Sequence, residues 1–218
     1  MQHQEWGASS TRPDGERPWW KFPDADVQKG KMVINQSGGF KQQDKQVAGR
    51  QQVKKRWKKP VEGRVKLNVD GGFSRNGAAG AGMVLRDHNG GVIAAACRYL
   101  DRCGDATEAE LQAIEEGMRL AMHWTTLPIT LEMDCSEAIE LIKDKNQNIS
   151  VYAFTISAIR ELLQERDICV TKISRDANMV SHELAKLGRI NHRTAVWYVD
   201  FPQEIEQAIA CDCNPVSS

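Results

Sequence analysis

Alternation of apolar and polar residues begins near residue 64 and divides the rest of the chain into short elements. Three runs with a period of two predict three successive strands, at residues 65–70 (VKLNVD), 80–87 (GAGMVLRD) and 91–100 (GVIAAACRYL). Residues 88–91 (HNGG) place an Asn-Gly pair between the second and third runs. Because this pair favours a tight hairpin, we expect these strands to be antiparallel neighbours.

A longer period of about 3.6 residues follows and predicts helices. In residues 107–124 the apolar Leu111, Ile114 and Met118 mark one helical face. The remaining pattern predicts a strand, two helices, a strand and a helix that Gly188 closes, at residues 129–135, 136–145, 151–166, 168–174 and 179–188. This order, βββαβααβα, predicts an α/β fold with a mixed five-stranded sheet and helices on both of its faces.

The two ends of the chain lack such a pattern. Residues 1–61 show no sustained period, so we expect a disordered basic arm, followed by one folded domain at residues 62–192. We expect residues 193–218 to be a weakly structured tail, because they hold only one weakly amphipathic segment.

Charge is unevenly divided, although the whole chain has 29 basic and 29 acidic side chains. Residues 1–60 hold 13 basic and 6 acidic side chains, which leaves 16 and 23 for the remainder. The arm ends in VKKRWKKP (53–60), with five cations around Trp57. Such a charge run is as consistent with a solvated linker as with a patch that binds phosphate without sequence preference.

The six cysteines show neither a CxxC pair nor zinc-type spacing, and several lie in apolar runs. A reduced intracellular setting fits this usage, without a choice between nucleus and cytoplasm. No apolar run approaches the length of about 18 residues that a membrane span needs, so we expect no membrane partner.

Two of the predicted strands carry an aspartate near their carboxyl ends. Asp70 ends residues 65–70 and Asp134 lies near the end of residues 129–135, each opposite the apolar face of its strand. If these strands are parallel neighbours, both carboxylates lie at the same edge of the sheet. Glu110 belongs to the helix between them and can flank that edge.

Each acid also has an ordinary structural explanation. Glu110 follows Thr107 by three residues, as in a capping box, Asp70 precedes two glycines as a turn residue can, and Asp134 can cap the next helix. Three acids at one sheet edge nevertheless favour a metal site, because clustered carboxylates repel unless a cation lies among them. Their hard oxygen ligands suit Mg²⁺ or Mn²⁺.

Four segments resemble the sequence blocks of type 1 ribonuclease H domains, and more closely those of the reverse-transcriptase-like, retroelement-related ribonuclease H domains of plants. The resemblance covers about residues 64–188, in order and with natural spacing. The segments are NVDGGF (68–73), EAELQAI (108–114), EMDCSEAI (132–139) and RDANMVSHELAKLG (175–188).

This resemblance implies a ribonuclease H-like fold and cleavage of the RNA strand of an RNA–DNA hybrid with two Mg²⁺ or Mn²⁺ ions. The acids of the family fall on Asp70, Glu110 and Asp134, which the resemblance makes both catalytic residues and metal ligands. One ion would activate a water and the other would stabilise the leaving 3′ oxygen. The family's fourth acid falls on His182, a fourth catalytic candidate that adds no negative charge.

The resemblance also suggests where nucleic acid is bound. The loop at residues 174–178 lacks the mobile histidine of bacterial and animal members, and the chain lacks their basic insertion. Contacts to sugar and phosphate are implied for Asn68, Gly71, Gly72 and Asn178, the glycines by admitting a nucleic-acid backbone closely. We expect the basic arm to supply the missing grip, with Lys54, Lys55 and Arg56.

The sequence therefore favours a monomeric endonuclease acting on RNA–DNA hybrids or other nucleic acid. Two alternatives stay open. One is a binding or interaction module in which His182 has ended catalysis, and the other is a fragment of a retroelement polyprotein.

Overall fold

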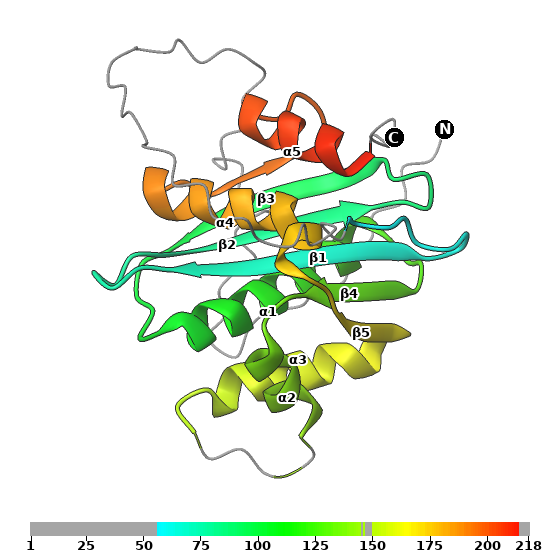
Figure 1. The fold of residues 1–218 in the computed structure, drawn as a ribbon. Helices are drawn as coiled ribbons and strands as arrows, with labels where there is room; N and C mark the ends of the chain where they lie inside the picture. Colours follow the sequence, from blue (N-terminus) through cyan, green and yellow to red (C-terminus); the bar gives the residue numbers. More distant parts are fainter. Residues whose placement is uncertain (1–55, 145, 147–149, 214–218) are drawn as a thin grey trace, which may run out of the picture.

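A six-stranded mixed sheet organises the computed structural model, which describes residues 56–144, 146 and 150–213 (Figure 1). Its strand order is β5-β4-β1-β2-β3-β6. β1 is parallel to β4 and β4 to β5, whereas the other neighbours are antiparallel. The strands are β1 (Val65–Phe73), β2 (Ala79–Arg86), β3 (Val92–Leu100), β4 (Ile129–Met133), β5 (Ile168–Lys172) and β6 (Ala195–Trp197). The parallel pairing of β1 and β4 is the arrangement that the two aspartates required.

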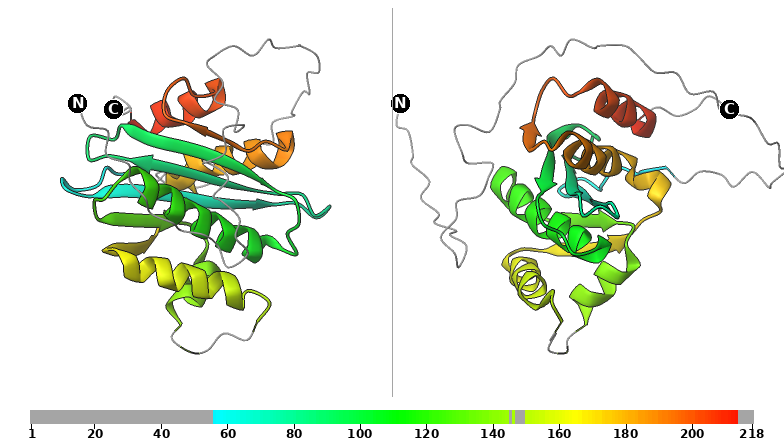
Figure 2. Two further views of the ribbon diagram at one scale, coloured as in Figure 1. Left: turned by 180° about the vertical axis from the view of Figure 1, so that it is seen from behind. Right: turned by 90° about the vertical axis from the view of Figure 1, so that its left-hand side faces the viewer.

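Helices cover both faces of this sheet, which confirms the predicted layers (Figure 2). One face carries α1 (Ala106–Trp124), with α2 (Ser136–Lys143) and α3 (Ala153–Glu165) beside it. The other carries α4 (Met179–Asn191) and α5 (Gln203–Cys213). A 3₁₀ turn, η2 (Arg175–Asn178), leads into α4. In the part of the chain that the structure describes, no helix is long and apolar enough to cross a membrane.

The alternation of β1 separates an apolar face from a polar one. Leu67 and Val69 are fully buried in the core beneath α1, whereas Asn68 and Asp70 lie on the α4 face. The α4 backbone packs directly on β2, since a Cβ on Gly82 would lie 2.0 Å from the Ser181 carbonyl oxygen. The polar side chains of β1 therefore meet the start of α4.

The carboxyl-terminal segment is more structured than its sequence suggested. β6 pairs with β3 through Ala195 and Cys97, and Ile205 of α5 is buried in the apolar cluster that α4, α5 and this side of the sheet form. The prediction of five strands and a weakly structured tail from residue 193 was therefore wrong for residues 195–213. Three residues of β6 are too few to show a period, and tertiary packing rather than pattern fixes this strand. Residues 214–218 lie outside the described part.

The folded part also begins earlier than the predicted boundary at residue 62. Trp57 is 6% exposed, and its ring lies 4.1 Å from the Arg86 guanidinium carbon. The side chain is therefore part of the domain rather than of the arm. Residues 1–55, where we expected disorder, lie outside the described residues.

One predicted hairpin is confirmed, and one predicted helix end is not. The β2–β3 hairpin is confirmed, with Asp87 and Gly91 joined by a backbone hydrogen bond and Gly90 at φ +87°. Gly188, in contrast, does not end α4, which closes at His192 in the left-handed conformation. A Cβ on Gly188 would lie 2.8 Å from the Arg98 carbonyl oxygen, so this glycine permits the close packing of α4 on β3.

Candidate metal centre

Three carboxylates from three elements meet beside β1, as the sequence predicted. Asp70 comes from β1, Glu110 from α1 and Asp134 from the residue after β4. One oxygen from each carboxylate lies within 4.8 Å of the other two. In the described part of the chain, no lysine or arginine forms an ion pair with any of the three. A compact set of oxygen ligands of this kind suits a hard divalent cation.

Asp70 does not lie at the tip of its strand. β1 continues to Phe73, and Gly71 and Gly72 pair with β2 instead of breaking the strand. The pairing of β1 with β4 stops at Asn68 and Glu132, however. The edge of β1 that faced β4 is thus open beside Asp70, and this opening admits the other two acids.

Glu110 is held by a backbone donor of β1. Its Oε2 accepts a hydrogen bond of 3.0 Å from the Gly71 N–H. The helix is capped by Asp105, whose Oδ1 accepts from the Glu108 N–H, so the capping-box explanation of Glu110 was wrong. A Cβ on Gly71 would lie 2.3 Å from the Glu110 backbone nitrogen. This glycine therefore lets the start of α1 lie against β1, which explains it without a nucleic-acid contact.

The electrostatics of the cluster oppose three negative charges. Burial, followed by the charges of Asp70 and Asp134, raises the pKa of Glu110 to about 8. The Gly71 N–H and the charge of Arg175 oppose this rise only in part. At neutral pH the metal-free cluster therefore retains a proton, which a divalent cation could replace.

Asp134 is oriented by a buried amide. Its Oδ1 accepts a hydrogen bond of 3.2 Å from Asn178 Nδ2, which also donates to the Val69 carbonyl at 2.9 Å. Asn178 is 1% exposed, and Ser181 Oγ donates to its Oδ1. Since α2 is capped by Cys135, the explanation of Asp134 as a helix cap was also wrong.

His182 lies next to the cluster but acts differently from an acid. Its Nδ1 lies 3.2 Å from Asp70 Oδ2, and this hydrogen bond is the main cause of a raised His182 pKa. The ring nitrogen that faces Asp70 can donate to this carboxylate in the neutral or the charged form of the ring, and a nitrogen that donates in this way does not bind a metal. On its other side, Nε2 lies 3.5 Å from an Arg175 nitrogen.

The other predicted binding residues are spread over several environments. Asn68 is 1% exposed and donates to Glu132 Oε2 at 3.0 Å, so this buried side chain links β1 to β4. Gly72 faces α4, where a Cβ would lie 3.5 Å from that of Ala185. Arg56 is exposed, whereas Lys54 and Lys55 lie outside the described residues.

Sequence reasoning missed two residues that matter here. Lys66 pairs with Glu132 two positions away from the cluster on the same strands, and the alternation showed only that both were polar. Arg175, in the loop that lacks a histidine, reaches His182 and so places a cation near the acids. Its position in the loop is evident from the sequence, but its proximity to His182 and the acids is not.

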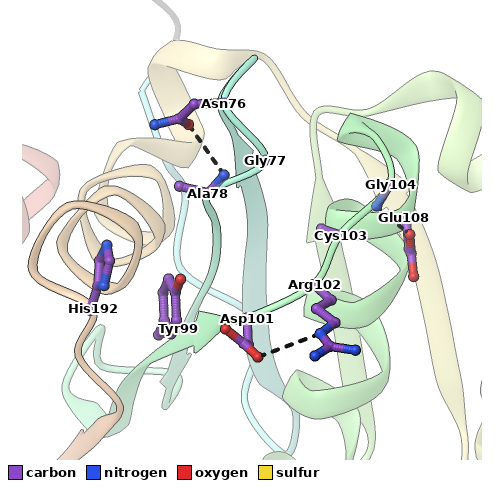
Figure 3. A pocket seen from close by; sticks show the side chains of 10 residues that line it. All are labelled: Asn76, Gly77, Ala78, Tyr99, Asp101, Arg102, Cys103, Gly104, Glu108 and His192. Atoms are coloured by element: carbon purple, nitrogen blue, oxygen red, sulfur yellow. Dashed lines mark hydrogen bonds and ion pairs between the residues drawn. The ribbon is translucent and has the colours of Figure 1, made fainter.

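A separate open cavity of about 700 Å³ lies between the β1–β2 turn and the start of α1 (Figure 3). His192 stacks on Tyr99 at its wall, with ring centroids 4.4 Å apart. The cavity contains none of the three clustered acids, and its charged lining of Asp101, Arg102 and Glu108 has no excess of cations. It therefore offers no clear anion site, and the chemistry is expected at the carboxylates.

A sequence model of the family described as reverse transcriptase-like matches residues 68–188, a range that contains all three acids and His182. The chain therefore belongs to the reverse transcriptase-like family. A search of curated proteins finds no match.

Solved structures similar to this family member are ribonucleases H of type 1 and related domains. One is RNase H1 from the archaeon Halobacterium salinarum, with 25% identity over 57% of this chain and 96% of that chain, at a TM-score of 0.53. LC11-RNase H1, isolated from compost, is 18% identical over 60% and 98% of the two chains, at 0.55. The RNase H domain of a Mycobacterium tuberculosis protein is 18% identical over 68% and 97%, at 0.52. The fold is thus ribonuclease H-like.

Proposed function

We propose that this protein is a metal-dependent endonuclease that hydrolyses the RNA strand of RNA–DNA hybrids. The observation that carries this proposal is the convergence of Asp70, Glu110 and Asp134 within 4.8 Å, without a lysine or arginine paired to them in the described part of the chain. The charges of such a cluster repel one another in the apo protein, and a bound cation would relieve this repulsion. Membership of a ribonuclease H-like family supplies the matching chemistry.

The three carboxylates would hold Mg²⁺ or Mn²⁺, in a two-metal site by the resemblance to ribonucleases H. Bound ions of this kind activate a water and stabilise the oxygen that leaves the phosphodiester. The chain itself positions the ligands, because the Gly71 N–H fixes Glu110 and Asn178 fixes Asp134. His182 donates to Asp70, so it orients a ligand instead of acting as one.

Arg175 is the cation best placed to meet an incoming phosphate. It is exposed, it lies within reach of His182, and its charge acts on Glu110. Guanidinium groups bind phosphate oxygens in a bidentate way. We assign Arg175 to a phosphate of the nucleic-acid backbone next to the scissile bond. Recognition of duplex shape and 2′-hydroxyls would then give low sequence preference.

A second candidate function is a nucleic-acid-binding module without catalysis. It is favoured by His182, which stands where the family has a fourth carboxylate and lowers the negative charge available to a second ion. The two functions share the binding face and differ only in cleavage.

Cleavage of an end-labelled RNA–DNA hybrid by the full-length chain, with Mg²⁺ or Mn²⁺, tests the proposal. We expect products that end in a 3′-hydroxyl, and no cleavage by Asp70→Asn. Asp200→Asn is the matched control, because Asp200 is exposed and its φ of 55° suits asparagine. Hybrid binding without cleavage in the presence of either metal would overturn the proposed enzymatic function and favour the binding module.

A further inference from the structure

Residues Arg56–Pro60, which we call the basic strap, are fixed to the domain on the face that carries the acids (Figure 1). Trp57 packs on Arg86, the last residue of β2, and is almost fully buried. The Lys58 carbonyl accepts a hydrogen bond of 2.6 Å from Lys66 Nζ. The strap is thus held by both a ring and a backbone contact, although it precedes β1.

A third contact fixes the far end of the strap. A Cβ on Gly90, in the β2–β3 hairpin, would lie 3.1 Å from Lys59 Cε, so the stem of Lys59 packs on this glycine. Lys58 and Lys59 are nevertheless exposed, because Trp57 and Pro60 are the residues that turn inward. The anchored strap therefore presents two neighbouring ammonium groups to solvent.

The strap lies at a useful distance from the acids. Lys66, which holds it, and Asp70 are four residues apart on one face of β1, or about 13 Å. Each strand of a duplex has a phosphate about every 3.4 Å along the axis, so about four nucleotides cover this distance. A nucleic acid with one phosphate at the acids can reach the strap with another.

Charge complementarity favours such an occupant. The chain from residue 61 onward has 23 acidic and 16 basic side chains, so its own field repels nucleic acid. The strap concentrates Arg56, Lys58 and Lys59 within four residues on the catalytic face. Fixed cations bind a phosphate backbone without first paying for the ordering of a flexible arm.

We propose that the basic strap is the phosphate-binding surface that grips the nucleic-acid backbone beside the acid cluster, with Trp57 as its anchor. This inference rests on the proposed function and adds where the substrate is held. It also replaces a freely moving arm by a surface of defined position, with Lys58 and Lys59 as its contacts.

The test measures binding of a labelled RNA–DNA hybrid at several salt concentrations by full-length Asp70→Asn, without added metal, so that cleavage does not consume the hybrid. Adding Lys58→Gln should weaken affinity about fivefold near 0.15 M salt and lower the slope of log K against log salt by roughly 0.9. Lys58→Gln with Lys59→Gln should about double the change in slope. Lys143→Gln, an exposed position at the end of α2, is the matched control and should change neither quantity.

Trp57→Ala separates anchoring from charge, since it keeps every lysine. It should weaken binding and lower the salt slope, and circular dichroism reports whether it still folds. If the parent binds the hybrid and the lysine variants of the strap bind it as Lys143→Gln does, the proposed role of the strap is wrong and the proposed function is unaffected. No hybrid binding by the parent, even at low salt, would overturn both.

Discussion

Two rows of side chains cross β1 and β4 on the same face of the sheet, and the carboxylates in the two rows differ in their partners. In one row, Glu132 is buried with Lys66 Nζ 2.6 Å from its Oε1 and the Asn68 amide on its Oε2. In the next row, Asp70 and Asp134 face each other and Glu110 with no lysine or arginine paired to them in the described residues. The first row thus holds a lysine for its carboxylate, whereas the second has only the His182 imidazole on Asp70 and the Asn178 amide on Asp134.

This difference in partners distinguishes a carboxylate that stabilises the fold from one that is a candidate metal ligand. A buried carboxylate with a cation and an amide has its charge and lone pairs satisfied. In the cluster, burial and then the charges of Asp70 and Asp134 raise the pKa of Glu110 to about 8, so this acid keeps a proton at neutral pH. Asn178 joins the rows, because Asn68 Nδ2 lies 3.4 Å from its Oδ1 and its own Nδ2 reaches Asp134.

The largest effect is expected from removing a carboxylate of the cluster. Asp70→Asn should lower the rate of hybrid cleavage by about a thousandfold or more, because a metal ligand supplies several kcal/mol of transition-state stabilisation. The free energy of unfolding without metal should change little, because the loss of one repulsive charge offsets the weaker hydrogen bond from His182. Single-turnover cleavage and urea unfolding measure the two quantities. Retained cleavage would contradict the role of the cluster.

The paired row should show the reverse pattern. Glu132→Ala leaves Lys66 without its carboxylate, so we expect a loss of about 3 kcal/mol in the free energy of unfolding. Urea denaturation measures this loss, with exposed Glu140→Ala as the control. If Glu132→Ala and Glu140→Ala unfold alike, the distinction between the rows fails.

Orientation by Asn178 should matter less than the ligands themselves. Asn178→Ala removes the donor to Asp134 and should weaken Mn²⁺ or Mg²⁺ binding by about 10- to 100-fold. Calorimetric titration of the purified variant measures the affinity. Ser181→Ala, which removes only the donor to Asn178 Oδ1, should have a smaller effect. An Asn178→Ala variant that binds metal as the wild type does would show that Asp134 needs no positioning.

How much of this site could be predicted from the sequence depended on the range of the interaction. The alternation and the helical period placed Asp70, Glu110 and Asp134 on elements that meet, because topology brings β1 and β4 together. The pairing of Lys66 with Glu132 is a contact between distant residues with the same alternation as any polar pair. Its existence depends on strand register, which the sequence did not show.

The same reason explains the errors in the fold. The opening beside Asp70 arises because β4 stops pairing before β1 ends, a property of two strands rather than of either sequence. β6 and α5 form through packing against β3 and α4, and Trp57 through packing on Arg86. Local pattern is silent on such contacts.

The last predicted effect concerns pH, and for each pH unit it is no larger than the effect of Asn178→Ala. Because the raised Glu110 pKa makes the metal-free protein hold a proton between its ordinary value of 4.5 and about 8, that proton competes with the metal. Metal affinity should rise about tenfold per pH unit up to about pH 8 and then level off. Titrations from pH 6 to 9 measure this slope. An affinity independent of pH over this range would show that Glu110 is already ionised.

The most direct test of the central claim is calorimetric titration of the full-length protein with Mn²⁺, comparing wild type, Asp134→Asn and Glu132→Gln. Each variant neutralises one carboxylate of the wild type, and the two positions lie in neighbouring rows at the end of β4. We predict that the wild type and Glu132→Gln bind the ion and that Asp134→Asn does not. Equal binding by Asp134→Asn, or no binding by the wild type, would contradict the assignment of the acid cluster as the metal centre.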